Sequence, residues 1–180
     1  MALEYLKSAP ITSLDATPPV RTTSGRGANG LLHHIDGTIT GTTLADIGST
    51  YRMVRVPSEA IIKELWAMLD TAVTSCVVDI GVYYSSATGD APPGTVVATA
   101  IDADLFGSAV ALTNVVVPTQ YTHEAAASAF AVADMFMPLW QAAGLSADPK
   151  CGLDIVFTAT TAFDGAPIMY CAVKYVLPGA

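Results

Sequence analysis

Charged residues are scarce in this 180-residue chain, at 13% of the sequence, whereas an average soluble domain has roughly 25%. Long apolar runs are missing too. The most apolar stretch, residues 125–140, is interrupted by Ser128, Asp134 and Pro138 and falls short of the about 18 uninterrupted apolar residues of a membrane helix. The first residues lack a basic segment followed by an apolar one, so no secretory signal is indicated. We therefore expect no membrane partner and synthesis in a cytoplasm.

Basic residues are few as well, with 8 Lys and Arg against 16 Asp and Glu and a net charge of −8. This balance argues against a nucleic-acid partner bound by phosphate neutralisation. Residues 1–63 hold six basic and five acidic residues, whereas residues 64–149 hold nine acidic and no basic ones. Opposite potentials on neighbouring copies would fit this asymmetry. An acidic surface that only maintains solubility fits it equally well.

Cysteine is limited to Cys76, Cys151 and Cys171. They form no C-x-x-C pair, and three cysteines cannot make a closed set of disulfides. Free cysteine is among the most buried residue types. We therefore predict that all three are small buried side chains in strands.

Residues 1–30 are rich in Ser, Thr, Pro and Gly, a composition that does not build a core of its own. We predict an extended N-terminal arm here, followed by one domain over residues 31–180. The arm carries spaced apolar and basic residues that could order on a partner. These are the candidate capsid or oligomer interface residues Leu3, Tyr5, Leu6, Ile11, Leu14, Val20, Arg21 and Arg26. An arm folded over its own domain is the alternative.

After the arm, short β-branched segments follow one another between turn signals, a pattern typical of an all-β antiparallel sandwich. Strands are predicted at residues 74–84, 95–100, 111–117, 151–157 and 169–177. The last two are expected to pair across the turn at residues 163–167. Residues 138–144 predict one short helix that ends at Gly144. Residues 61–69 fit an amphipathic helix and a strand, and we assign a strand because the surrounding pattern is all-β.

No complete catalytic, cofactor or metal motif is present. His33, His34 and Asp36 lack the spacing of a metal site. Asp102 and Asp104 could act as an acid/base pair or bind Ca²⁺, but nothing nearby completes either site, so we predict a solvated turn. The serines and glycines match no nucleophile or phosphate motif. We therefore expect no enzyme and no cofactor.

The aromatic residues offer one alternative. Four of them could form a sugar-stacking platform, although aromatics at dispersed strand positions are usually core or subunit contacts. They are Trp66, Tyr83, Tyr84 and Trp140.

Six segments follow one another in a characteristic order along nearly the whole chain: residues 6–20, 48–58, 79–83, 101–109, 137–149 and 169–176. In this order and spacing the chain resembles a family of tailed-bacteriophage virion proteins, the small head-associated decoration or cement type. Two stretches depart from that pattern: residues 64–149, which contain no basic side chain, and the alanine-rich residues 125–133. The resemblance therefore does not identify the face that docks on the capsid. The family supplies no catalytic residues.

The resemblance implies a β-sandwich, of jelly-roll type, that lies over joints between major capsid protein subunits. An immunoglobulin-like strand order stays open, because periodicity does not encode strand order. The implied partners are the major capsid protein and further copies of this chain, as a dimer or trimer. The implied location is the capsid surface of a virion made in a bacterial cytoplasm. The alternative is a host-recognition module on a head fibre or tail that binds glycans through its aromatics.

Overall fold

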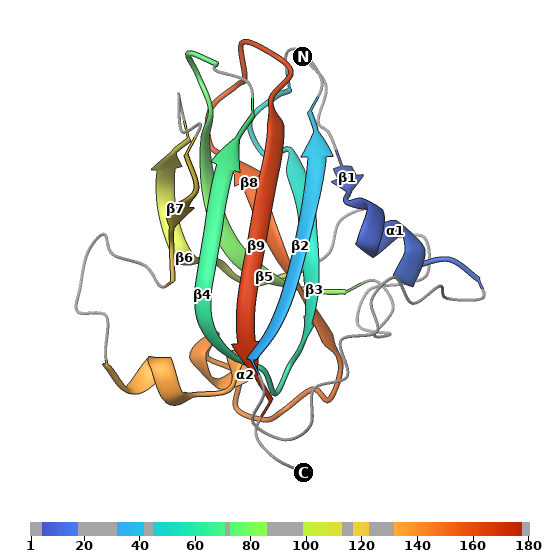
Figure 1. Cartoon of the computed structure of the whole chain (residues 1–180), viewed down its shortest axis with the longest axis vertical. Helices are drawn as coiled ribbons and strands as arrows, with labels where there is room; N and C mark the ends of the chain where they lie inside the picture. The colour runs from blue at the N-terminus through green and yellow to red at the C-terminus, as the bar shows by residue number, and fades with distance from the viewer. Residues whose placement is uncertain are drawn as a thin grey trace.

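Two β-sheets face each other and form a sandwich in the computed structural model (Figure 1). The structure describes residues 5–17, 32–41, 45–70, 73–85, 99–112, 117–122 and 132–177. One sheet has the order β1-β3-β8-β5-β6 and the other the order β2-β9-β4-β7. The strands are β1 (Tyr5–Lys7), β2 (Leu32–Thr40), β3 (Thr50–Pro57), β4 (Ile61–Leu69), β5 (Val77–Tyr84), β6 (Ala100–Ala111), β7 (Thr119–Gln120), β8 (Gly152–Ala159) and β9 (Ile168–Val176). The predicted all-β sandwich is confirmed.

The antiparallel pairs are nested along the chain. β2 pairs with β9, β3 with β8, β4 with β7 and β5 with β6. Among the strands from β2 to β9, the outermost in sequence thus pair with each other, as in one long hairpin that has been rolled up. The pairs β4 with β9 and β5 with β8 then join the rolled hairpin into two sheets.

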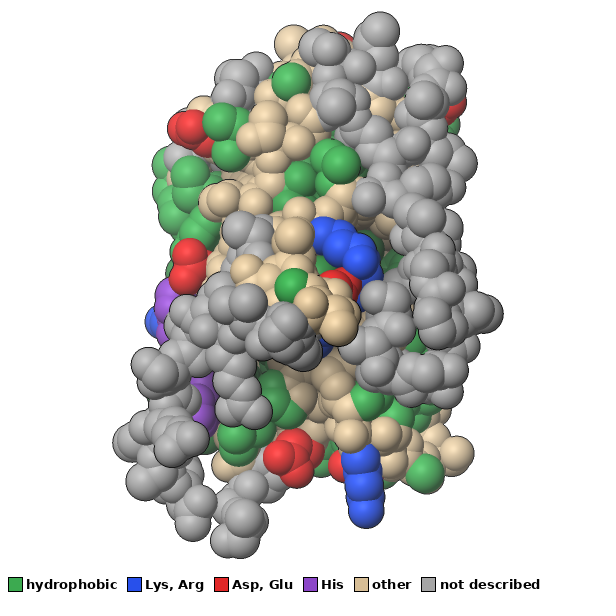
Figure 2. Space-filling model, turned by 90° about the vertical axis from the view of Figure 1, so that its right-hand side faces the viewer, with side chains coloured by type: hydrophobic (Ala, Val, Ile, Leu, Met, Phe, Trp, Pro, Cys, Tyr) green, Lys and Arg blue, Asp and Glu red, His purple; other side chains and the backbone are tan. Residues whose placement is uncertain are grey.

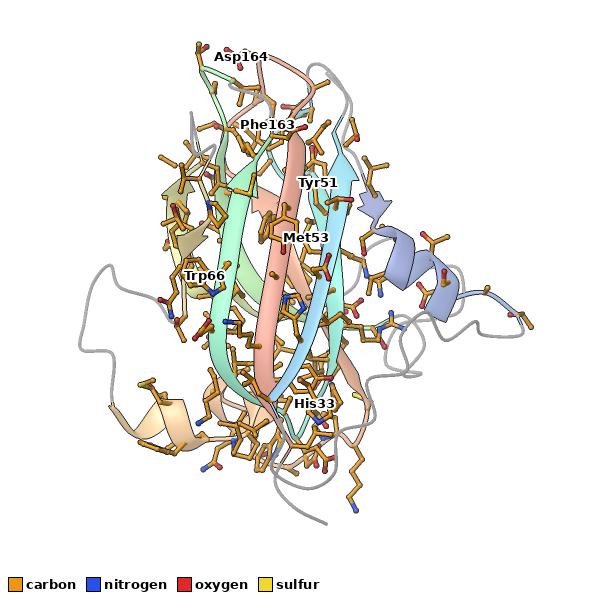
Figure 3. All side chains as sticks on the ribbon, in the orientation of Figure 1. His33, Tyr51, Met53, Trp66, Phe163 and Asp164 are labelled. Carbon is orange, nitrogen blue, oxygen red and sulfur yellow. The ribbon has the colours of Figure 1, made fainter. Side chains whose placement is uncertain are left out.

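The prediction that the last two strands pair with each other is wrong. β8 lies in the five-stranded sheet and β9 in the four-stranded one. The connecting loop crosses the end of the sandwich because Phe163, only 1% exposed, inserts into the core and stacks on Tyr51 with ring centroids 5.7 Å apart (Figure 3). Alternation identifies the buried face of a strand but not the neighbour with which it pairs.

The strand assigned to residues 61–69 is confirmed as β4. Its core positions are Ile62, Leu65, Ala67 and Leu69. The register against β9 shifts between Ile62 and Glu64, which marks a bulge. This bulge produces the three-residue step from Ile62 to Leu65 that resembles helical spacing in the sequence.

The helical elements are short. Helix α2 (Leu139–Ala142) confirms the predicted short helix, and Gly144 after it has the positive φ of 78° that favours glycine. A 3-10 helix, η2 (Val132–Phe136), precedes it. Helix α1 (Ala9–Leu14) differs from the extended chain expected over residues 1–30. Among the described helices, none has the length and apolar character needed to cross a bilayer.

The strand predicted at residues 95–100 lies mostly outside the described residues. So does most of the one at residues 111–117, of which Ala111 ends β6. The domain boundary after residue 30 stays a prediction.

Candidate docking site at the edge of β3

The most unusual feature of the fold is a set of buried charges on the outer face of the five-stranded sheet. Four side chains of β3 point into the core: Tyr51, Met53, Val54 and Val56. The register of β3 against β8 shifts between Arg52 and Val54. In a regular strand, residues three apart face opposite sides. The bulge places Arg52 and Arg55 on the same outer face.

Asp154 of β8 lies directly opposite Arg55. Its neighbours Leu153 and Ile155 are core residues, so its carboxylate faces outward with the two arginines. Nε of Arg52 donates to Asp154 Oδ2 at 2.6 Å, and Nε of Arg55 donates to Oδ1 at 2.6 Å. Nη2 of Arg52 also contacts Oδ2. One carboxylate thus holds two guanidinium groups.

These three side chains are buried although they lie on an outer face. Asp154 is 0% exposed, and the side chains of Arg52 and Arg55 are 4% and 10% exposed. Burying a charge is expensive unless it is paired and hydrogen-bonded. The contacts to Asp154 satisfy this condition, but two cations and one anion still leave an excess positive charge.

Asp15, which follows α1, provides the second carboxylate. Its Oδ1 lies 3.0 Å from Nη1 of Arg55, and its Oδ2 lies 3.6 Å from Nη1 of Arg52 and 2.7 Å from Nζ of Lys7. Figure 2, which views the side of the molecule that carries β1 and α1, shows basic and acidic side chains next to each other near its middle. We call Lys7, Asp15, Arg52, Arg55 and Asp154 the charge cluster.

Electrostatics holds Asp15 and Arg55 in their ionised forms. Burial by itself raises the pKa of Asp15, but the hydrogen bond from Lys7 and the positive charges of Arg55 and Arg52 outweigh burial, so the pKa lies below its usual value. Burial by itself lowers the pKa of Arg55, but its contacts with Asp154 and Asp15 raise it above the usual value. Asp15 therefore stays a carboxylate at neutral pH.

The backbone of the N-terminal segment also docks on β3. Strand β1 runs parallel to β3, with Tyr5 opposite Thr50 and Lys7 opposite Arg52. The N–H of Ser8 donates to the carbonyl of Arg52 at 3.0 Å, and its hydroxyl donates to the carbonyl of Met53. Through this pairing, the three residues of β1 form the edge strand of the five-stranded sheet.

Helix α1 contacts both β3 and β2, so it covers the seam between the two sheets. Its Ile11 is 0% exposed, and burying such a side chain contributes about 1.5–3 kcal/mol. Gly37 of β2 makes the close approach possible. A Cβ there would lie 2.4 Å from the carbonyl oxygen of Met53 and 3.3 Å from Ser8.

Of the eight residues predicted as interface candidates, four lie within the described residues and four outside them. Leu6 packs against the core and Ile11 is fully buried, so both contact the chain's own body. Tyr5 pairs through its backbone, and Leu14 ends α1. The remaining four lie outside the described residues: Leu3, Val20, Arg21 and Arg26. Their role in an interface stays a prediction.

Sequence reasoning missed the charge cluster. The available signal was a pair of arginines inside an apolar strand and one aspartate inside the alternation of residues 151–157. Reading it required the bulge in β3 and the pairing of β3 with β8, which are separated by about a hundred residues in the sequence.

The other sequence candidates do not assemble into a site. His33 stacks on Tyr175 with ring centroids 5.1 Å apart, whereas His34 is exposed beside Asp36. His123 lies outside the described residues. Within the described part of the chain, no group of three or more His, Cys, Asp and Glu side chains could hold a metal.

Asp102 and Asp104 lie inside strand β6, so the prediction of a solvated turn is wrong. Strand β6 has twelve residues and pairs with β5 in an antiparallel arrangement interrupted by several bulges. Sequence periodicity does not reveal such an interrupted strand. The N–H of Asp104 donates to Asp102 Oδ1 at 3.3 Å. Burial, together with the neighbouring Asp104, raises the pKa of Asp102.

The four aromatic residues proposed as a platform come from both sheets and from helix α2. Trp66 is in the four-stranded sheet, where its Nε1 donates to Glu64 (Figure 3). Tyr83 is 5% exposed in the five-stranded sheet, and its hydroxyl lies 2.8 Å from that of Thr158. Tyr84 and Trp140 pack against the core.

The prediction of three cysteines buried in strands is met in full only by Cys171. Cys76 and Cys171 are buried, and Cys151 is half-buried; all three are free thiols. Burial and the charge of Asp164 raise the pKa of Cys76 to about 12. Only Cys171 lies within a strand.

The chain is similar to known proteins in its fold and not in its sequence. No family model matches the chain, and no curated protein matches it. A chain in the capsid of Ralstonia phage GP4 is similar over 97% of this chain and 99% of that chain, with a TM-score of 0.64 and 14% identity. A chain in the capsid asymmetric unit of cyanophage Pam1 is similar over 91% and 97%, with a TM-score of 0.51 and 13% identity.

Proposed function

We propose that this chain is a structural protein of a phage virion that binds the outside of the capsid and stabilises contacts between major capsid protein subunits. The observation that carries the proposal is the end-to-end similarity to a chain in the capsid of Ralstonia phage GP4, which covers 97% of this chain and 99% of that one. The shared architecture thus extends over the whole of a capsid chain of nearly the same length.

Charge favours the outer surface over the inner one. The net charge of −8 would oppose contact with packaged DNA, whose phosphates attract basic proteins. The basic residues of β3 are paired inside the molecule with Asp15 and Asp154. A low charged fraction also fits a protein with several covered faces, because the cores of permanent interfaces contain few charges.

We infer that the sandwich is a jelly roll. The nested pairs of β2 with β9, β3 with β8, β4 with β7 and β5 with β6 support this inference. A double-sheet jelly roll has eight strands, and the eight strands from β2 to β9 account for both sheets except for the added strand β1.

A capsid offers many repeated sites, so modest contacts suffice for tight attachment if the chain assembles as a dimer or trimer. The partners are then the major capsid protein and other copies of this chain. The protein would be made in the cytoplasm of a bacterial host and would reside on the capsid surface.

The decisive experiment measures the copy number of the chain relative to the major capsid protein in purified particles, by quantitative mass spectrometry. We expect hundreds of copies per particle, and particles that lack the chain should break at lower temperature. A few to a few dozen copies would favour the alternative, a host-recognition module of a head fibre or tail. Absence from the particles would refute a virion role.

A further inference from the structure

The N-terminal segment of residues 5–15 depends on its docking site for its conformation. Helix α1 has six residues, its N-cap Ser8 makes no side-chain capping hydrogen bond, and its first turn holds no acidic residue. Isolated helices shorter than about 12 residues are marginal in water. Asp15 at the C-terminal end also opposes the helix dipole. The segment is therefore ordered by the surface beneath it.

Part of that surface is held in place by the body of the chain itself. Asp154 holds Nε of both arginines, which leaves Nη1 of each directed at Asp15. The carbonyls of Arg52 and Met53 accept from Ser8, and Gly37 provides the space. Strand β3 thus presents a seat for a short strand followed by a carboxylate.

We propose that this seat is also an interface between copies of the chain, in which residues 5–15 of one copy dock on β3 of a neighbouring copy. Fourteen residues, 18–31, join Thr17 to Leu32. Such a connection reaches up to about 50 Å. A domain of this size has a radius of gyration of about 16 Å and is roughly 40 Å across. The segment can therefore reach a neighbour in contact with its own domain.

The exchange keeps every docking contact, because the partner copy supplies the same Ser8, Ile11 and Asp15. The two arrangements differ only in the distance that residues 18–31 must span, and the free energy of closing such a loop depends weakly on its length. Exchange then requires neighbours at an effective concentration on the order of mM, as for short tethers. Copies fixed side by side on a capsid meet this condition, so the inference rests on the proposed function. It would link the copies into a network.

Cross-linking of two variants, each with one introduced cysteine beside the three native ones, tests the exchange. Tyr5 lies opposite Thr50 in the register of β1 and β3. Particles are decorated with a mixture of full-length Tyr5→Cys and Thr50→Cys and treated with a short bismaleimide. Because neither chain has both introduced thiols, we expect an interchain product that mass spectrometry assigns to positions 5 and 50.

Two controls define the result. The double variant Tyr5→Cys/Thr50→Cys reports the register, because it can react within one chain. A mixture of Tyr5→Cys with Thr38→Cys, whose position on β2 is exposed, reports random collisions. We expect the Tyr5→Cys and Thr50→Cys mixture to exceed this background several-fold.

An intrachain product in the double variant, with only background in the mixture, would overturn the exchange and leave the capsid role intact. Because Thr50 is only 9% exposed, maleimide labelling first verifies that the cysteine introduced at position 50 reacts; a lack of both products would then overturn the exchange as well, since the segment would not lie on β3 in the particle. If the wild-type chain is absent from particles, the copy number records the failure of the proposed function, and this inference fails with it.

Discussion

At the scale of single residues, Asp154 determines whether the outer face of the five-stranded sheet can bury two arginines. The carboxylate is fully buried and accepts from both Arg52 and Arg55. Buried ion pairs contribute little net stability compared with well-packed apolar residues, but removal of one partner leaves the other charges uncompensated. The cluster is therefore a point of high sensitivity to substitution.

We expect Asp154→Asn to lower the free energy of unfolding by about 3–5 kcal/mol, because two buried guanidinium groups lose their counter-charge. Urea denaturation at neutral pH measures the change. Asp36→Asn is the matched control, since the side chain of Asp36 is 55% exposed, and a change within about 0.5 kcal/mol is expected there. Equal effects of the two substitutions would contradict the role assigned to Asp154.

The lowered pKa of Asp15 predicts a pH-dependent contribution to stability. A carboxyl whose pKa is lower in the folded state stabilises the fold above its unfolded value of about 3.9, and this contribution is lost as the pH falls through the folded value. The stability difference between wild type and Asp15→Asn should be constant at neutral pH and shrink below about pH 4. A difference that stays constant down to pH 2 would contradict this.

Asp102 is the opposite case, because burial and Asp104 raise its pKa. A raised pKa means that the charged form weakens the fold, so stability increases as the pH falls through the folded value. Asp102→Asn should therefore be more stable than wild type at neutral pH, and the difference should disappear in acid. Thermal unfolding between pH 3 and 7 measures it.

At the scale of elements, glycine decides how closely two strands approach. A Cβ at Gly81 of β5 would lie 2.2 Å from the carbonyl carbon and oxygen of Ala103 in β6. Contacts shorter than 3 Å require the backbone to shift. The bulged pairing of β5 with β6 therefore depends on the absence of a side chain at this position.

Gly81→Ala is expected to lower the free energy of unfolding by about 1–3 kcal/mol, as other overpacking changes do. Gly41→Ala serves as control, because its Cβ would approach Pro167 no closer than 3.4 Å, an ordinary contact distance. Chemical denaturation of both variants gives the comparison. A tolerated Gly81→Ala would mean that β6 adjusts freely against β5.

The elements also show where sequence reasoning succeeds. Strands β4, β5, β8 and β9 and helix α2 lie close to their predicted positions, because each has its own periodicity or stop signal. Helix α1 was missed because it has only six residues and no dipole-favouring charge, although Ser8 at its N-cap and Pro10 in its first turn are residue types common at helix starts. Its helical form depends on the burial of Ile11 at the seam between the sheets.

At the scale of the whole molecule, the N-terminal segment is separable from the sandwich. The pairs from β2 to β9 form both sheets without β1 and α1. The segment adds the burial of Ile11 and the ion pairs of Asp15. Its removal should therefore weaken the fold without abolishing it.

Deletion of residues 1–30 is expected to leave a folded but less stable domain that no longer attaches to capsids. Circular dichroism measures the fold, and occupancy of purified capsids measures attachment. Full-length Ile11→Ala is the matched control: it should lose about 2–5 kcal/mol of stability while it keeps the remaining contacts of the segment. Unchanged occupancy by the truncated chain would refute a role of the arm in attachment.

The sequence by itself determined that this chain is an all-β protein with few charges and several alternating strands. Those properties depend on composition and on residues close together in the chain. Only the tertiary structure decided that β8 and β9 lie in different sheets and that Arg52, Arg55, Asp154 and Asp15 meet. Pairing between distant strands and a one-residue bulge set these contacts, and neither leaves a local pattern in the sequence.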